Sequence, residues 1–291
     1  MLSRTTIDRV VAAALDEDAP WGDLTSEYLI PENARARADL VARESGVFSG
    51  GDVFAAAFRL TDPRIEVQLV VEDGEWFEPG SVLAVVTGPA RGVLTAERIG
   101  LNFAQRMSGI ATLTGRYVAE VAHTRARIAD TRKTTPGLRA FERKAVRDGG
   151  GRNHRHSLSD AVMAKDNHLA VLSRRAEPAA WGATITGALQ AAKDRLPHTT
   201  HLEVEVDRLD QIEPVLAAGI GTIMLDNFSL DDLRAGVAQV AGRATVEASG
   251  GVSLETVRAI AETGVDVISV GALTHSAPAL DIGLDVRIDA P

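Results

Sequence analysis

Short apolar runs recur through the second half of the chain and alternate with amphipathic stretches. The runs lie at 126–130, 161–164, 201–206, 222–225, 244–248 and 267–270. Apolar residues spaced as on one helix face occupy several of the intervals, at 183–195, 208–218, 229–241 and 253–263. Strands that alternate with helices in this way build parallel sheets. We therefore predict a (β/α) barrel, with an open doubly wound sheet as the alternative architecture.

The first part of the chain, up to about residue 90, has a different pattern. The expected helices are 7–15 and 52–60, and the expected strands are 35–43, 65–71 and 82–86. Turn-forming Asp-Gly and Pro-Gly pairs stand at 73–74 and 79–80, next to the last of these strands. Short strands joined by such turns predict an α+β domain with an antiparallel sheet.

A long helix is expected next, starting at Thr95 and ending near His123. Thr95 is a good N-terminal capping residue, and Glu97 places a negative charge in the first turn. Ser108-Gly109 marks a point at which this helix could break. Arg98 lies near the helix start, where the pattern alone predicts a surface arginine.

The composition excludes several classes of protein. The chain has 291 residues, of which 45% are hydrophobic and 24% charged, as in globular proteins. It has no cysteine, which excludes disulfides, thiolate catalysis and cysteine-ligated metals. A net charge of −9 argues against nucleic acid as a partner. No membrane-spanning or signal segment is expected, and we predict a cytoplasmic protein.

Basic residues concentrate in one stretch of this acidic chain. Eight Lys and Arg residues face only Glu142 and Asp148 between positions 132 and 155; they are Arg132, Lys133, Arg139, Arg143, Lys144, Arg147, Arg152 and Arg155. The spacing of Arg139, Arg143 and Arg147 predicts one solvated helix face. Arg132, Lys133, Arg152 and Arg155 lie instead among Thr, Gly, Asn and His residues, and with His154 and Lys165 they predict a site for an anionic small molecule.

Polar residues stand where the predicted strands end. They are Arg132, Lys133, Lys165, Glu205, Asp226, Glu247, Ser249 and Gly271. The carboxyl ends of barrel strands form the active site, so we expect these side chains to converge. Glu205 and Asp226 would lie on neighbouring strands, where two carboxylates suit Mg²⁺. General acid or base catalysis is the alternative use of this pair.

Two loops of small residues follow the last two predicted strands. The first contains Ser249 and Gly250 in the segment 247–255, and the second covers 270–276. Backbone N–H groups in such loops, at the start of a helix, can bind phosphate. Together with the cations and the carboxylate pair, they suggest transfer chemistry on a phosphorylated sugar. A lyase with Lys133 or Lys165 as a Schiff base is a rival, and a non-catalytic binder of anionic metabolites is a third possibility.

At these residues the sequence resembles the quinolinate phosphoribosyltransferase family. The resemblance covers nearly the whole chain and rests on long, ordered motifs. They are Asp130-Thr-Arg-Lys-Thr-Thr-Pro-Gly-Leu-Arg139, Gly149-Gly-Gly-Arg-Asn-His-Arg155, Lys165-Asp-Asn-His168, Glu203-Val-Glu-Val-Asp207, Leu225-Asp-Asn-Phe228, Glu247-Ala-Ser-Gly-Gly251 and Val270-Gly-Ala-Leu-Thr-His-Ser276. Thr95-Ala-Glu-Arg98 also matches.

The resemblance implies two domains and a shared active site. An N-terminal α/β sandwich would take residues 1–110 with a C-terminal return at 276–291, and an irregular α/β barrel would take 111–275. The resemblance implies a homodimer in which Arg98 enters the partner's active site. Quinolinate would be bound by Arg132, His154, Arg155 and Lys165. Phosphoribosyl pyrophosphate and Mg²⁺ would be surrounded by Lys133, Glu205, Asp226, Ser249, Gly250, Gly271 and His275.

The implied reaction joins the pyridine nitrogen of quinolinate to the anomeric carbon, with loss of pyrophosphate and then of CO₂. Lys133, Lys165, Glu205 and Asp226 would be the catalytic residues, with Glu205 and Asp226 holding the metal. Two positions depart from the family pattern. Lys144 stands where an aromatic residue is expected, and His156 stands where a methionine is expected. Both changes would add basic groups beside the quinolinate pocket, so another aromatic or pyridine carboxylic acid is the alternative substrate.

Overall fold

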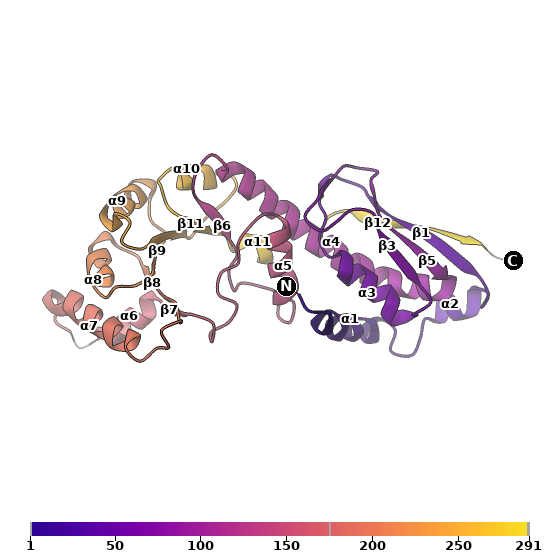
Figure 1. The fold of residues 1–291 in the computed structure, drawn as a ribbon, viewed down its shortest axis with the longest axis horizontal. Helices are drawn as coiled ribbons and strands as arrows, with labels where there is room; N and C mark the ends of the chain where they lie inside the picture. Colours follow the sequence, from indigo (N-terminus) through magenta and orange to yellow (C-terminus); the bar gives the residue numbers. More distant parts are fainter. Residues whose placement is uncertain (1, 175, 290–291) are drawn as a thin grey trace. The chain divides into compact units, whose positions relative to one another are not determined.

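The chain folds into two compact units, each made of several segments (Figure 1). The computed structural model describes residues 2–174 and 176–289. The first unit comprises Met1–Gly115, Thr134–Gly150 and Leu273–Pro291, and the second comprises Arg116–Lys133 and Gly151–Ala272. The domains expected from the sequence differ from this division chiefly at 134–150. This segment packs in the first unit, where the rings of Phe141 and Phe103 lie 5.5 Å apart between centroids.

The first unit is built on a four-stranded antiparallel sheet, as the sequence predicts. The strand order is β12 (Ile282–Asp289), β1 (Arg35–Ala42), β5 (Val82–Pro89) and β3 (Glu66–Leu69). A separate pair joins β2 (Gly46–Val47) to β4 (Trp76–Phe77). The helices of this unit include α1 (Arg4–Asp18), α2 (Leu24–Leu29), α3 (Gly51–Thr61) and α5 (Arg139–Asp148). Alternate residues of β1 are buried, as expected for a sheet with one face on the core.

The long helix α4 (Ala90–Val121) starts earlier than the sequence suggested and does not break. The prediction of a start at Thr95 is wrong, because β5 ends at Pro89 and the helix follows at once. Thr95 lies inside the helix, where its hydroxyl donates to the carbonyl of Arg91 at 2.9 Å. Even this helix lacks the apolar stretch that a membrane span requires, as does every other helix of the described residues.

The second unit contains the predicted parallel sheet. Its six strands are ordered β6 (Arg127–Ala129), β11 (Val267–Ser269), β10 (Thr245–Ser249), β9 (Thr222–Asp226), β8 (Leu202–Val206) and β7 (Val162–Ala164). All five pairings are parallel, and none of the described pairings joins β6 to β7. The predicted fold class, a parallel α/β domain after an antiparallel first domain, is confirmed, and every predicted strand of this half is present.

Helices cover the outside of this curved sheet (Figure 1). They are α6 (Asp166–Leu172), α7 (Trp181–Lys193), α8 (Ile212–Leu216), α9 (Leu230–Val240) and α10 (Val257–Ala261), with the 3-10 turns Pro178–Ala180 and Leu209–Gln211. The short helix α11 (Ala272–His275) follows β11. Because all six strands run the same way, their carboxyl ends meet at one edge, where the sequence places most of the candidate site residues.

We predict that Gly109→Ala destabilises the first unit by about 1–3 kcal/mol. A methyl group on Gly109 would overlap the backbone carbonyl of Pro278, and a backbone cannot move away as a side chain can. Gly115→Ala in the same helix is the control, because a methyl group there meets only ordinary contacts at 3.6 and 3.8 Å. That change should be neutral or stabilising by up to about 1 kcal/mol, from helix propensity alone. Urea unfolding of both variants measures the difference, and equal stability would contradict the packing described.

Candidate active site

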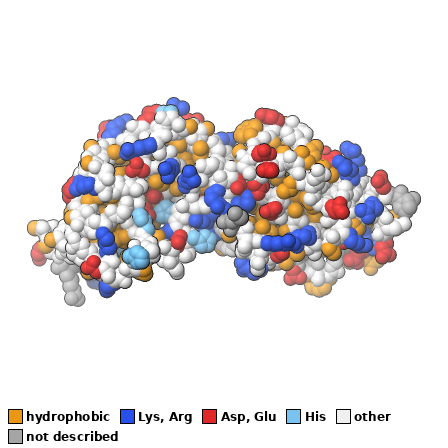
Figure 2. All heavy atoms as spheres, viewed as in Figure 1, with side chains coloured by type: hydrophobic (Ala, Val, Ile, Leu, Met, Phe, Trp, Pro, Cys, Tyr) orange, Lys and Arg blue, Asp and Glu red, His pale blue; other side chains and the backbone are white. Residues whose placement is uncertain are grey.

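A cavity of about 600 Å³ opens at the carboxyl ends of the strands of the second unit. Nine of the residues predicted for the site line it together: Arg132, Lys133, His154, Arg155, Lys165, Glu205, Asp226, Ser249 and Gly250. In Figure 2, His side chains and several Lys and Arg side chains gather on the face of the second unit in view. The expectation that the strand ends converge on one site therefore agrees with the geometry of this unit.

Three predicted residues are not among those that line the cavity. Arg98 and His275 belong to the first unit, and both are exposed. His275 lies in α11, where its Nδ1 is 2.6 Å from the hydroxyl of Ser276. Gly271 lies in the second unit, two residues after β11, and is half-buried. The cavity is therefore built from the second unit alone.

The cationic side of the cavity brings like charges together. Burial and the neighbouring charge of Arg132 lower the pKa of Arg155. The Arg155 guanidinium is held in place because its Nη1 donates to the carbonyl of Ala161 at 2.9 Å. Neighbouring guanidinium groups repel each other, and an anion bound between them relieves that repulsion. This side of the cavity therefore suits a ligand with carboxylate or phosphate groups.

Lys165, directly after β7, forms an ion pair with Glu205 on the neighbouring strand β8. Its Nζ donates to Glu205 Oε2, and the Glu205 side chain is only 10% exposed. A Schiff base requires an uncharged amine, whereas a lysine in an ion pair is an ammonium. The geometry therefore argues against the lyase hypothesis for Lys165.

Glu205 and Asp226 could hold a divalent cation. Both line the cavity from neighbouring strands, and each contributes carboxylate oxygens, the donor type that Mg²⁺ prefers. Asp226 Oδ2 accepts from the side-chain amide of Asn227 at 2.7 Å, which orients the carboxylate. The donor types fit Mg²⁺ together with substrate phosphates.

The loop after β10 has a backbone that only small residues can form. Gly250 and Gly251 have φ of +96° and +60°, and Asn227 on the facing loop has φ of +58°. A side chain on Gly250 would overlap the Asn227 side chain, so the two loops approach closely here. Helix α10 begins at Val257, later than the predicted 253. The residues of this region that line the cavity therefore include Gly250 and Gly251 of the loop. The sequence pointed to Gly250, whereas Asn227 appeared only within the motif Leu225-Asp-Asn-Phe228 and had no assigned role.

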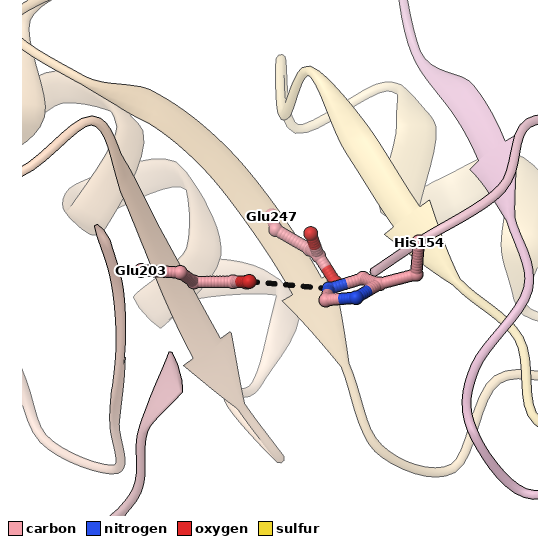
Figure 3. A group of neighbouring side chains, drawn as sticks. All are labelled: His154, Glu203 and Glu247. Atoms are coloured by element: carbon pink, nitrogen blue, oxygen red, sulfur yellow. Dashed lines mark ion pairs between the residues drawn. The ribbon is translucent and has the colours of Figure 1, made fainter. Parts of the chain in front are cut away.

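A buried trio of ionisable side chains adjoins the cavity (Figure 3). His154 Nε2 lies 3.1 Å from Glu203 Oε2 and 3.5 Å from Glu247 Oε1, and both glutamates are buried. Burial would lower the pKa of His154, but its bonds to Glu203 and Glu247 raise it to about 10. Burial also raises the pKa of Glu203. Among the described residues, His154, Glu203 and Glu247 are the one group of at least three His, Asp or Glu side chains whose ligand atoms lie close enough together to share a metal ion.

Asp130 supports the loop that carries His154. It is fully buried at the end of β6, and its carboxylate accepts from the backbone N–H of His154 and the side-chain amide of Asn153, both at 2.7 Å. The sequence showed Asp130 only as the start of a motif. Its role could not be predicted, because its partners lie more than 20 residues away.

The two departures from the family pattern lie elsewhere than expected. Lys144 belongs to the first unit, where its Nζ donates to Asp73 and, at 2.6 Å, to Asp148. Burial alone would lower the pKa of Lys144. The hydrogen bonds and charges of Asp148 and Asp73 outweigh burial, so the pKa is raised. His156 is exposed, and its backbone N–H donates to Asp160 at 2.7 Å. Neither side chain is among those that line the cavity.

The family models and the similar proteins found for this chain agree on one family. The quinolinate phosphoribosyl transferase N-terminal domain matches residues 23–108, and the C-terminal domain of the same name matches residues 110–285. The nicotinate-nucleotide pyrophosphorylase (carboxylating) of Mycobacterium leprae is 42% identical over 292 residues, covering 98% of this chain and 97% of that protein. The probable enzyme of the same name from Bacillus subtilis is 40% identical over 272 residues, covering 94% of this chain and 90% of that protein.

A solved structure agrees over the full length. The crystal structure of NadC from Streptococcus pyogenes has a TM-score of 0.92 and 37% identity, and the match covers 100% of this chain and 99% of that one. Both domains, the order of the motifs and the residues lining the cavity thus lead to one conclusion. The chain belongs to the quinolinate phosphoribosyltransferase family.

Proposed function

We propose that this protein transfers the phosphoribosyl group of phosphoribosyl pyrophosphate to quinolinate and releases CO₂, giving nicotinate mononucleotide and pyrophosphate. The observation that carries the proposal is the cation side of the cavity, where Arg132 and Arg155 lie close together and Lys165 lines the same space. Quinolinate is a planar dianion, and several fixed cations can bind its two carboxylates. Placement in the NAD pathway and in the cytoplasm is part of the same proposal.

The chemistry follows from the two sides of the cavity. A bond forms between the pyridine nitrogen and the anomeric carbon while the bond from that carbon to the pyrophosphate oxygen breaks. Positive charge develops on the ribose ring, and the carboxylates of Glu205 and Asp226 would stabilise it. The carbon–carbon bond to the adjacent carboxylate then breaks, its electron pair passes to the pyridinium ring, and a proton takes its place. Lys165 would assist electrostatically by stabilising the negative charge that develops on the ring carbon as CO₂ leaves.

Mg²⁺ belongs to the proposal as the ion that Glu205 and Asp226 would hold. When bound, it would neutralise the charge of the leaving pyrophosphate. Lys133, Ser249 and Gly250 would contact the phosphates. The lysine offers a positive charge, and the glycine-lined loop offers backbone N–H donors that no side chain covers. Gly271 and His275 would complete this side in the assembled enzyme.

We also propose a homodimer in which Arg98 enters the partner's active site. The first unit carries an apolar surface that one chain does not cover: Trp21, Leu24, Tyr28 and Leu29 are 92%, 66%, 81% and 74% exposed. This surface adjoins the helix that carries Arg98, because Thr95 Oγ1 donates at 3.2 Å to Asp23, the capping residue of α2. Exposed apolar patches of this kind mark protein interfaces.

The alternative substrate, another aromatic or pyridine acid, rested on Lys144 and His156. Neither side chain is among those that line the cavity of this chain, so the cavity gives that alternative no support. Quinolinate remains the substrate that the cavity and the family favour.

We expect Arg132→Ala and Arg155→Ala each to lower kcat/KM for quinolinate by about tenfold to a hundredfold or more. Each removes a charged hydrogen-bond donor from a desolvated site, a loss of about 1.5–3 kcal/mol or more. Arg234→Ala is the control, because Arg234 is exposed and bonds only an exposed aspartate of its own helix among the contacts described. Near-normal turnover by either cavity variant would contradict the assignment, provided that its circular dichroism spectrum matches the parent.

We expect a mixture of Arg98→Ala and Lys165→Ala subunits to regain activity that neither variant has alone. If Arg98 serves the partner's site, each mixed dimer has one intact site, so random exchange restores about a quarter of the parental activity. A mixture of Lys165→Ala and Arg132→Ala subunits is the control. Both of its defects fall in the cavity of their own chain, and no site is intact. Absence of recovery after verified subunit exchange would refute the shared site.

A further inference from the structure

A buried carboxylate of helix α5 holds the chain that follows two cations of the cavity. Glu142 is 1% exposed, and the contacts described for its carboxylate all lie in the first unit. Its Oε1 accepts from the hydroxyl of Thr135 at 2.8 Å, and its Oε2 accepts from the backbone N–H of Thr135 at 3.0 Å. Thr135 comes two residues after Lys133. Glu142 therefore fixes the end of the segment on which Arg132 and Lys133 lie.

A guanidinium from helix α4 meets this carboxylate and continues to a second segment. Arg106 Nη2 donates to Glu142 Oε1 at 2.7 Å and also to the backbone carbonyl of Thr274. Arg106 Nη1 donates to the backbone carbonyl of Ala277 at 3.0 Å. Arg106 therefore joins α5 to the chain that follows β11.

The two anchored segments carry residues of the proposed site. The β6 segment, residues 130–135, follows β6 and contains Arg132 and Lys133. The β11 segment, residues 270–277, follows β11 and contains Gly271 and His275. In the proposed function the β6 segment serves both substrates, whereas the β11 segment serves phosphoribosyl pyrophosphate alone. A binding residue is placed only as well as its supporting contacts allow, so one ion pair affects both sets of ligands.

The choice of charged groups fits a positioning role better than a stabilising one. Burial of a carboxylate and a guanidinium costs hydration free energy, and apolar side chains could fill the same space without that cost. Charged hydrogen bonds are short and directional, and the planar fork of an arginine binds several acceptors at fixed angles. The fork of Arg106 reaches one carboxylate and two backbone carbonyls. The pair therefore determines where its partners lie.

We infer that Arg106 and Glu142 are positioning residues for substrate binding, although neither is among the residues that line the cavity. Glu142 acts through Thr135 on the β6 segment, and Arg106 acts through two backbone carbonyls on the β11 segment. The inference rests on the proposed function, which assigns the acid and the phosphates to these segments. Because the segments serve different substrates, changes at their two anchors have different expected effects.

Thr135→Val and Arg106→Lys test the two anchors separately. Thr135→Val removes the hydroxyl that bonds Glu142 and keeps the shape of the side chain, so it should raise KM for both substrates about threefold to tenfold. Arg106→Lys keeps a charge near Glu142 but lacks the fork that reaches both carbonyls. It should raise KM for phosphoribosyl pyrophosphate about tenfold and leave KM for quinolinate within about twofold of the parent.

Unchanged KM values in either folded variant would overturn the inference, because a merely structural role changes only the amount of folded enzyme. An equal rise of both KM values in Arg106→Lys would overturn it as well, since the β11 segment serves one substrate.

Asp148 offers a matched control on the same helix. Its side chain is 15% exposed, and its carboxylate accepts from Lys144 and from the hydroxyl of Ser49, both at 2.6 Å. Neither partner belongs to the β6 segment or the β11 segment. Glu142→Gln should raise both KM values about tenfold, whereas Asp148→Asn, which also replaces a carboxylate by an amide, should leave both unchanged. Equal effects of these two variants on KM would contradict the inference.

Amide hydrogen exchange tests the anchors without catalysis. Exchange should be about fivefold faster over residues 130–135 in Thr135→Val and over residues 270–277 in Arg106→Lys, with neither changed in Asp148→Asn. Unchanged exchange in the first two variants would overturn the inference even if their activity fell. If the parental enzyme did not turn over quinolinate, the proposed function would fail. The exchange rates would still decide whether the pair anchors the two segments.

Discussion

Repulsion between buried or half-buried cations at the strand ends is the constraint on which the site depends. Arg132 and Arg155 lie close enough for one charge to lower the pKa of the other. Such an arrangement is unfavourable in the empty protein and favourable once a dianion is bound, so the free energy stored there contributes to ligand selection. The fold helps to hold these cations in place, because Asp130 accepts hydrogen bonds from Asn153 and His154 and the carbonyl of Ala161 accepts from Arg155.

The parallel sheet makes this arrangement possible. The carboxyl ends of the six strands lie at one edge of the sheet. Residues at or just after each of these ends line the cavity. Carboxylates from the ends of β8 and β9 and cations from the loops that follow β6 and precede β7 line the same cavity, and Lys165 after β7 pairs with Glu205. A sugar phosphate and an aromatic acid need those two environments side by side, because the first requires a metal-binding side and the second requires fixed cations.

Apolar periodicity predicted the strands of the second unit well, since a strand buried on both faces gives a short, continuous apolar run. The start of α4 was missed because the capping pattern at Thr95 was weighed above Pro89, which ends β5 directly before the helix. Lys144 was expected beside the cavity because it stands where the family pattern has an aromatic residue. Its position is decided instead by Asp73, 71 residues away. The contacts of His154 Nε2 depend likewise on Glu203 and Glu247, 49 and 93 residues further along the chain, and no local pattern reports such contacts.

The most direct test of the central claim is an assay of the purified protein with phosphoribosyl pyrophosphate, Mg²⁺ and either quinolinate or nicotinate, in which the mononucleotide and CO₂ are measured together. The account predicts that quinolinate yields both products in equal amounts and that nicotinate yields neither, because a single carboxylate cannot satisfy the paired arginines. Product from nicotinate, or no product from quinolinate with folded protein, would contradict it.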